Sequence, residues 1–257
     1  MTLADTAAEL RRLHTDPELL QVVNVWDVVS ATAVAALPQT RALATASHSI
    51  AATFGYPDGE QIPVELMLDM CGRIARAVDV PVSADLEAGY GDAGETIRRA
   101  IGEGIAGANL EDQLKPLADS VAAVAAAVAA GEAEGVPFAL SARTDAFLRG
   151  RERPLDVNVA DAIERGRAYL DAGATSVFVP GMFGEEVVAQ LVAGIGELKV
   201  TLIGLPGVPA PARLQELGVA RVSYGPTTQR VALGALQDLA TSLYDGGVLP
   251  EGIRPLN

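Results

Sequence analysis

Residues that carry much of enzyme chemistry are scarce in this sequence, which has one cysteine and two histidines among 257 residues. The single Cys71 excludes an internal disulfide and a zinc site built from cysteines. His14 and His48 are too few for a multi-histidine metal site, and they argue against a Ser-His-Asp triad. Lys115 is expected in a loop and Lys199 at the start of a strand, which argues against a Schiff-base aldolase because that enzyme needs a desolvated lysine beside its substrate.

Positive charge and long apolar runs are also in short supply. Lysine and arginine together number 19 against 33 acidic residues, which gives a formal net charge of −14. This balance argues against nucleic acid or an anionic membrane as a partner. No apolar run approaches the roughly 18 to 20 residues that span a bilayer, and the first residues carry Asp5, Glu9 and Arg11 rather than a signal-peptide core. The sequence therefore predicts a soluble cytoplasmic protein.

Short apolar runs recur along the chain, most of them ending in polar or glycine-rich residues and separated by helical patterns. Counting gives about eight strand–helix units, the pattern of a (β/α)₈ barrel. The strands are expected at 20–26, 41–47, 78–84, 104–110, 135–142, 172–179, 198–203 and 217–224. A doubly wound open sheet is the alternative, but no G-x-G-x-x-G follows the first strand. We expect residues 1–257 to form one barrel domain with a short N-terminal helix at 2–14.

Two acids follow the third predicted strand, where parallel α/β proteins bind their ligands. Asp85 and Glu87 are two residues apart, so on a strand their side chains leave from the same face. Two such carboxylates repel each other unless a cation or a proton lies between them, and hard oxygen ligands suit Mg²⁺. The alternative is a strand end with solvated acids that cap the following helix.

The ends of the other strands converge on the same mouth of a barrel. Glu111 ends the fourth strand, and Asp58 lies in a loop that could reach the acids. Arg143, at the end of the fifth strand, is the cation best placed to bind a carboxylate by bidentate pairing. Thr45-Ala46-Ser47 can offer backbone N–H groups and hydroxyls to an anion. Together these residues describe a site for a 2-oxo acid or its enolate.

Several of these residues have a second interpretation that the sequence leaves open. Arg143 could neutralise Asp145 or Glu111 in a structural network. Tyr90 could be a structural residue of its glycine-flanked turn or face a ligand, and His48 could be a polar residue without a catalytic role. Trp26 could pack in the barrel or contact the substrate.

The assembled motifs resemble those of the isocitrate lyase/phosphoenolpyruvate mutase superfamily, over roughly residues 20 to 245. The segment 85–91 is similar to the family's D-x-D-x-G-[YF]-G metal motif, with Glu87 in place of the second aspartate. Segments 110–113 and 141–146 are similar to its E-D-[QK] and A-R-T-[DE]-A strands. Residues 54–58 resemble its L-G-x-P-D loop, and 45–47 occupy the place of its oxyanion-binding segment.

The resemblance implies roles for these residues. Asp85 would bind Mg²⁺ directly, while Asp58, Glu87 and Glu111 would hold its waters, and Arg143 would hold a substrate carboxylate. The family makes or breaks C–C or C–P bonds through an enolate or 2-oxo acid. Its barrels usually swap the eighth helix between subunits, which would be 227–244 here, and assemble as dimers or tetramers.

The departures from the family pattern narrow the function. Isocitrate and methylisocitrate lyases carry K-[KR]-C-G-H after the fourth strand, whereas here Gln113 is followed only by 114–116 before a helix begins. The long gating loop of the mutases is also missing. We therefore expect a Mg²⁺-dependent lyase or decarboxylase of a small 2-oxo or 2-hydroxy carboxylate, with Arg143, Tyr90 and His48 as catalytic candidates. The alternatives are a C–P bond enzyme like phosphoenolpyruvate mutase or phosphonopyruvate hydrolase, and a barrel that binds a 2-oxo acid such as 2-oxoglutarate without turnover.

Overall fold

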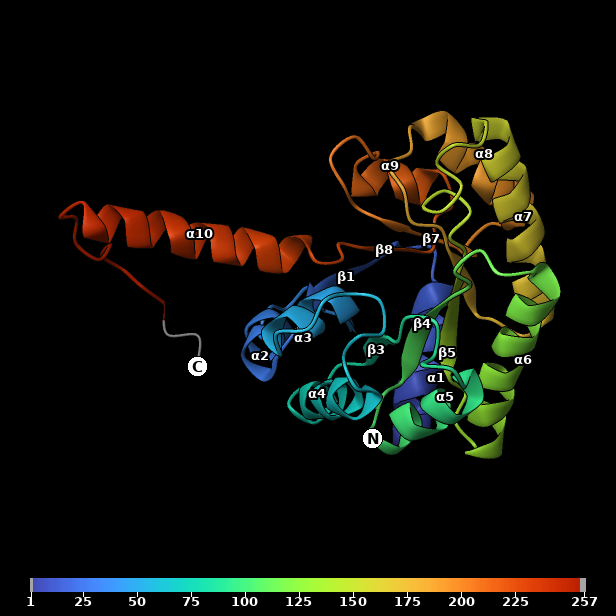
Figure 1. The fold of residues 1–257 in the computed structure, drawn as a ribbon, viewed down its shortest axis with the longest axis horizontal. Coiled ribbons are helices and arrows are strands. Elements are labelled where there is room, and N and C mark those ends of the chain that lie inside the picture. Colours follow the sequence, from blue (N-terminus) through green and yellow to red (C-terminus); the bar gives the residue numbers. More distant parts are fainter. Residues whose placement is uncertain (1, 255–257) are drawn as a thin grey trace.

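A closed barrel of eight parallel strands forms the centre of the protein in a computed structural model that describes residues 2–254 (Figure 1). Each strand pairs with the next along the chain, and β8 returns to β1 with Leu20 opposite Arg221. The strands are β1 (Leu20–Val25), β2 (Leu43–Thr45), β3 (Val82–Asp85), β4 (Gly107–Glu111), β5 (Ala139–Arg143), β6 (Ser176–Phe178), β7 (Val200–Ile203) and β8 (Arg221–Ser223). The predicted (β/α)₈ barrel is therefore confirmed, and the open sheet is excluded.

The described part of the chain has ten helices. They are α1 (Leu3–His14), α2 (Val28–Ala35), α3 (Ser47–Thr53), α4 (Val64–Arg76), α5 (Ala93–Gly102), α6 (Leu117–Ala133), α7 (Leu155–Asp171), α8 (Glu185–Ile195), α9 (Pro211–Glu216) and α10 (Thr227–Tyr244). The sequence analysis missed α3 and α9. It also extended the second strand to Ser47, which instead begins α3 because its N–H and hydroxyl turn toward Asp85.

Polar side chains cross the interior of the barrel. Ser141 on β5 lies 3.2 Å from Thr201 on β7, measured between their hydroxyl oxygens. Arg221 on β8 donates from Nη1 to the hydroxyl of Ser83 on β3 at 3.1 Å. Neither pair of strands is adjacent in the barrel, so both contacts run through its interior. Small side chains at this level leave room for the long arginine.

Helix α1 packs at the amino-terminal end of the strands, where it buries Leu10, Leu13 and His14. A Cβ on Gly107, the first residue of β4, would lie 2.5 Å from the Ala139 backbone oxygen on β5 and 2.8 Å from Leu10 Cδ2 on α1, so glycine is needed where the two strands and the helix meet. His14 Nδ1 bonds the Leu10 carbonyl at 2.8 Å. Burial lowers the pKa of His14 to about 3, with a smaller contribution from the nearby positive charge of Arg221. This end of the barrel is therefore closed.

Helix α10 differs from the others because it projects away from the barrel (Figure 1). Gln229 is its one buried side chain. Val231, Leu233 and Leu236 are 68%, 54% and 60% exposed, which leaves apolar surface on the helix without a partner in the chain. None of the helices within residues 2–254 combines the length and apolar character needed to cross a bilayer.

We predict that His14 makes the fold sensitive to acid. The native pKa of about 3 lies below the unfolded value of about 6.5, so below pH 6.5 the unfolded chain binds a proton that the native state excludes. Stability is therefore lost as the pH falls, by about 2 kcal/mol at pH 5. In thermal unfolding at pH 7 and pH 5, His14→Leu should lose less stability than wild type, by about 5 °C in Tm.

The matched control for this prediction is His48→Gln, which alters the other histidine, a half-exposed side chain. It should keep the acid sensitivity of wild type. Equal losses of Tm in wild type and His14→Leu would contradict the assignment.

Candidate active site

Asp85, the last residue of β3, is held in place by the start of α3. Its Oδ2 accepts hydrogen bonds from the Ser47 hydroxyl at 2.7 Å and the Ser47 N–H at 3.1 Å. Its own N–H donates to Thr45 Oγ1 at 3.0 Å, which ties the ends of β2 and β3 together. The half-buried carboxylate is therefore fixed at the carboxyl end of the barrel, with Oδ1 receiving no bond from Ser47.

Glu87 lies near Asp85 for a different reason from the one predicted. β3 ends at Asp85, and Glu87 has a left-handed backbone with φ of 51°, so the two residues do not share a strand face. A non-glycine residue in this conformation is uncommon and occurs at functional sites. Glu87 is 4% exposed, and its Oε2 accepts the N–H of Glu60. Burial raises the pKa of Glu87 to about 7, with further contributions from Asp85 and Asp58.

Glu60 and Tyr90 complete this corner of the site. The Glu60 carboxylate accepts the N–H of Tyr90 at 2.6 Å, and the Tyr90 hydroxyl lies 3.4 Å from Glu87 Oε1. Burial and the negative charges of Glu87 and Asp85 raise the pKa of the Tyr90 phenol. Sequence reasoning missed Glu60. Its position next to the Asp58-Gly59 turn was the available signal, since such a turn directs backbone donors inward.

Arg143 ends β5 between two carboxylates. Its Nη1 pairs with Glu111 at 2.7 Å, and its Nη2 pairs with Asp145 at 2.8 Å, with the Nε–H also donating to Asp145. The guanidinium and both acids are largely buried. Burial raises the pKa of Glu111 to about 7, although Arg143 acts to lower it. The predicted structural network around Arg143 is therefore present, at the place where a carboxylate ligand would bind.

Behind this pair, Asp112 anchors the ends of β4 and β5. One oxygen accepts the N–H groups of Leu114 and Asp145 at 2.7 and 2.9 Å. The other accepts the hydroxyl of Tyr169 at 2.7 Å and lies 3.2 Å from Arg165. Four donors satisfy this buried carboxylate, so its role is to hold the strand ends. The sequence placed Asp112 beside Glu111 but gave no sign of these distant partners.

His48 and Asp58 pair with each other on the outer side of the site. His48 Nδ1 lies 3.5 Å from Asp58 Oδ2, and the side chains are 40% and 54% exposed.

Ala46 is buried directly before α3. Trp26 lines an apolar groove with Val29 and Thr228 and packs against the core, without a hydrogen bond to the acids or Arg143.

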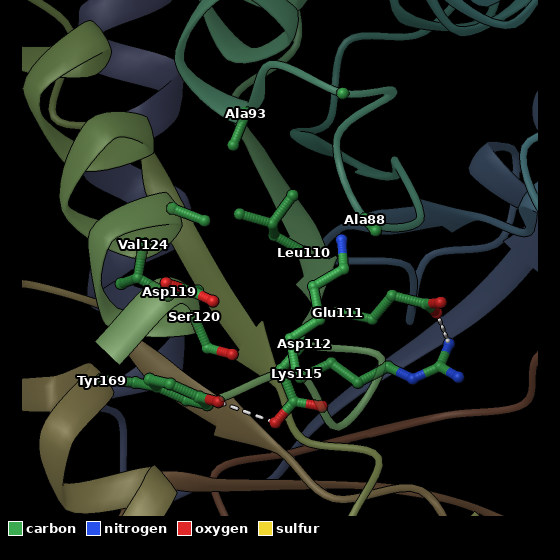
Figure 2. A pocket seen from close by; sticks show the side chains of 13 residues that line it. Ala88, Ala93, Leu110, Glu111, Asp112, Lys115, Asp119, Ser120, Val124 and Tyr169 are labelled. Carbon is green, nitrogen blue, oxygen red and sulfur yellow. Dashed lines mark hydrogen bonds and ion pairs between the residues drawn. The ribbon is translucent and has the colours of Figure 1, made fainter. Parts of the chain in front are cut away.

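A cavity of about 200 Å³ adjoins the ion pair of Glu111 and Arg143, which both contribute to its wall (Figure 2). Its other walls include Leu110, Tyr169 of α7, residues of the loops after β3 and β4, and small residues of α5 and α6. Figure 2 shows Lys115 extending along Leu110 toward Ala88, although the sequence placed this lysine only in a loop. The lysine is solvent-exposed, so the argument against Schiff-base chemistry stands.

The predicted metal acids do not form a closed ligand cluster. Within residues 2–254 no three histidine, cysteine, aspartate or glutamate side chains are arranged to hold a metal ion. Asp58 faces His48, Glu87 faces the Glu60 amide and Glu111 faces Arg143, because each carboxylate has found another donor. An all-oxygen donor set in which burial, and to a lesser degree the neighbouring acids, raises the pKa values of Glu87 and Glu111 nevertheless fits hydrated Mg²⁺, which needs only one or two carboxylates and keeps several waters.

Comparison with known proteins places these features in a family. The family model described as phosphoenolpyruvate phosphomutase matches residues 10–244. A solved structure from Burkholderia cenocepacia, described as a candidate phosphonomutase, is 37% identical, has a TM-score of 0.86, and is matched over 96% of this chain and 100% of that one.

Two relatives have named activities. An oxaloacetate decarboxylase of Paraburkholderia xenovorans is 30% identical, covering 89% of this chain and 79% of its own. The structure of an oxaloacetate acetylhydrolase with its product oxalate is 27% identical, with a TM-score of 0.87 and coverage of 99% and 92%. With the family match over almost the whole barrel, these comparisons confirm the resemblance read from the motifs. The chain belongs to the isocitrate lyase/phosphoenolpyruvate mutase superfamily.

Proposed function

We propose that this chain is a Mg²⁺-dependent lyase or decarboxylase that acts on a small 2-oxo or 2-hydroxy carboxylate through an enolate. The observation that carries the proposal is the meeting of three acids, Asp85, Glu87 and Glu111, with Arg143 at the open end of the barrel. The acids suit a hydrated divalent cation, and the arginine suits a carboxylate. The names of the two oxaloacetate-processing relatives support the same class of reaction.

In this proposal Asp85 is the direct ligand of Mg²⁺, and Asp58, Glu87 and Glu111 hold waters around it. Ser47 occupies one oxygen of Asp85 with two hydrogen bonds, so it orients the carboxylate and leaves the other oxygen for the cation. When bound, Mg²⁺ supplies Lewis-acid stabilisation for the negative charge that develops in the reaction.

Arg143 binds the substrate carboxylate. Asp145 accepts hydrogen bonds from Nε and Nη2 of Arg143, which fixes the plane of the guanidinium. Nη1, which pairs with Glu111 in this structure, is therefore the group that would pair with the substrate carboxylate instead. The Thr45-Ala46-Ser47 segment contributes to the anion site through its position at the start of α3, and Trp26 follows β1 and lines the apolar groove beside α2.

Tyr90 and His48 are the proposed proton-handling residues, with different abilities. The raised pKa of Tyr90 keeps its phenol protonated, so it can donate a hydrogen bond but is a poor base. His48 is half-exposed and oriented by Asp58, as an acid–base residue in contact with solvent would be.

Two other functions remain as alternatives. A C–P bond mutase or hydrolase is supported by the family description and by the Burkholderia cenocepacia relative. A non-catalytic barrel that binds a 2-oxo acid is supported by the short β4–α6 connection, since α6 begins at Leu117 and leaves little chain to cover the mouth. Turnover of phosphonopyruvate would favour the C–P bond enzyme. Binding of a 2-oxo acid with no product would favour the non-catalytic barrel.

We further propose that the protein is a single-domain, cytoplasmic homodimer or homotetramer in which α10 packs against another subunit. Exposed Val231, Leu233 and Leu236 support this, because a lone projecting helix gains its stability from packing. An apolar groove between β1, α2 and the start of α10 offers a surface of matching character.

We predict that Asp85→Asn abolishes coupled binding of Mg²⁺ and oxalate, an enolate analogue. Wild type should show a larger thermal shift with both ligands than the sum of the two single shifts, because each ligand completes the site of the other. The neutral amide removes the anionic metal ligand, so the synergy should disappear. Asp69→Asn on the exposed face of α4 is the control. Unchanged synergy or unchanged turnover in Asp85→Asn would refute the metal role.

We predict that Arg143→Lys lowers kcat/KM for the best 2-oxo acid substrate by about 100-fold, because lysine keeps the charge but loses the paired Nε and Nη2 contacts with Asp145 that orient the cation toward the substrate. The charge also keeps the buried Glu111 and Asp145 from being left unpaired, so the variant should fold. Arg149→Lys, an exposed neighbour of Asp145, should retain wild-type kinetics. Steady-state kinetics measure the change in kcat/KM. A loss of kcat/KM below threefold in Arg143→Lys would exclude a direct contact between Arg143 and the substrate.

We predict that Leu236→Glu lowers the mass of the assembly measured by light scattering after size-exclusion chromatography, because it places a charge on the exposed apolar side of α10. Gln237→Glu adds the same charge to an already polar position and should leave the assembly intact. A wild-type monomer, or equal masses for the two variants, would contradict the proposed packing.

A further inference from the structure

Arg221 is a buried cation that the proposed mechanism does not use. It is 2% exposed and is the largest of the fully buried side chains of the protein. Its one side-chain hydrogen bond within residues 2–254 runs from Nη1 to Ser83 Oγ at 3.1 Å, and no carboxylate there lies within 4.0 Å of it. Buried charges are normally paired, so an arginine left with a single neutral partner requires an electrostatic explanation.

The position of Arg221 lies directly beneath the candidate active site. Ser83 precedes Asp85 by two residues on β3, so both side chains face the barrel interior. A strand rises about 3.3 Å per residue, which puts Asp85 roughly 7 Å above the level at which Arg221 bonds Ser83. Asp85 is the one charged group that raises the pKa of Arg221 against the lowering effect of burial. The two residues are therefore coupled through the interior.

Among the described residues, Arg221 is the one side chain that supplies positive charge at this level of the interior. His14 lies toward the closed end of the barrel, and its lowered pKa keeps it neutral. Asn109, whose β4 position pairs in register with Asp85, has a buried Oδ1 without a partner. The interior below the site is thus polar, and Arg221 is the charge that it contains.

The open end of the barrel above Arg221 has an excess of negative charge. Asp85, Glu87 and Glu111 lie close enough to influence one another, while Arg143 is already shared between Glu111 and Asp145. Such a cluster attracts a divalent cation strongly but repels a substrate that is itself a carboxylate. A fixed cation beneath the acids would reduce both effects, because interactions over this distance are little screened in a buried interior.

We propose that Arg221 is a positioning residue that sets the balance between cation and anion binding at the mouth, acting through Asp85 rather than by touching the ligand. It makes the site bind Mg²⁺ less tightly and the carboxylate substrate more tightly than the acids alone would allow. This inference rests on the proposed function, since it assumes that both ligands meet at Asp85.

The test is isothermal titration calorimetry of the full-length protein at pH 8, first with Mg²⁺ alone and then with oxalate at saturating Mg²⁺. Arg221→Met removes the charge but keeps an unbranched side chain. It should bind Mg²⁺ about tenfold more tightly and oxalate about tenfold more weakly than wild type. Damage to the packing of the site would weaken both ligands, so opposite shifts are a result that a purely structural role cannot give.

Three further variants make the result decisive. Arg221→Lys restores the charge and should bind both ligands with affinities near wild type. Arg73→Met makes the same change in net charge at an exposed helix position and should have no effect. Arg221→Gln, which can still bond Ser83, repeats the test if Arg221→Met fails to fold.

Unchanged affinities in folded Arg221→Met, or shifts of both ligands in the same direction, would overturn the inference while leaving the proposed function intact. Failure of both uncharged variants to fold would also overturn it, because the cation would then serve stability. Absence of any Mg²⁺ or oxalate binding by wild type would refute the proposed function and this inference together.

Discussion

The burial of several carboxylates close together at the open end of the barrel is the constraint on which the rest of the site depends. Glu87 and Glu111 are buried beside Asp85, and the pKa of each is raised to about 7. Every neighbouring donor is arranged around this charge. Ser47 bonds Asp85, the Glu60 amide bonds Glu87 and Arg143 bonds Glu111. An arrangement that concentrates like charges in this way is stable when a cation or a proton is also held there.

The protein fixes this arrangement from outside the site as well as within it. Asp112 ties the end of β4 to the residues after β5 and to α7, and α1 closes the far end of the barrel against Gly107. At the open end only the short connection 112–116 separates β4 from α6.

The sequence was sufficient for the architecture, because eight apolar runs with polar ends can close only into a small number of folds. It also brought Asp85, Glu111 and Arg143 to one end of the barrel, because strand ends converge there, while the roles of these residues stay a prediction. The sequence failed at positions where the local backbone geometry decides where a side chain lies. Glu87 was predicted from strand alternation, but a left-handed turn brings it to Asp85. Ser47 was expected in a strand and instead begins α3. Glu60 and Arg221 act through contacts with residues far along the chain, which spacing cannot reveal.

The most direct test of the central claim is a crystal structure of the protein with Mn²⁺, as a stand-in for Mg²⁺, and oxalate. The account predicts one anomalous peak bonded to a single oxygen of Asp85, waters held by Glu87 and Glu111, and Arg143 Nη1 donating to oxalate. A metal bound elsewhere, or oxalate bound without contact to Asp85 or Arg143, would contradict it.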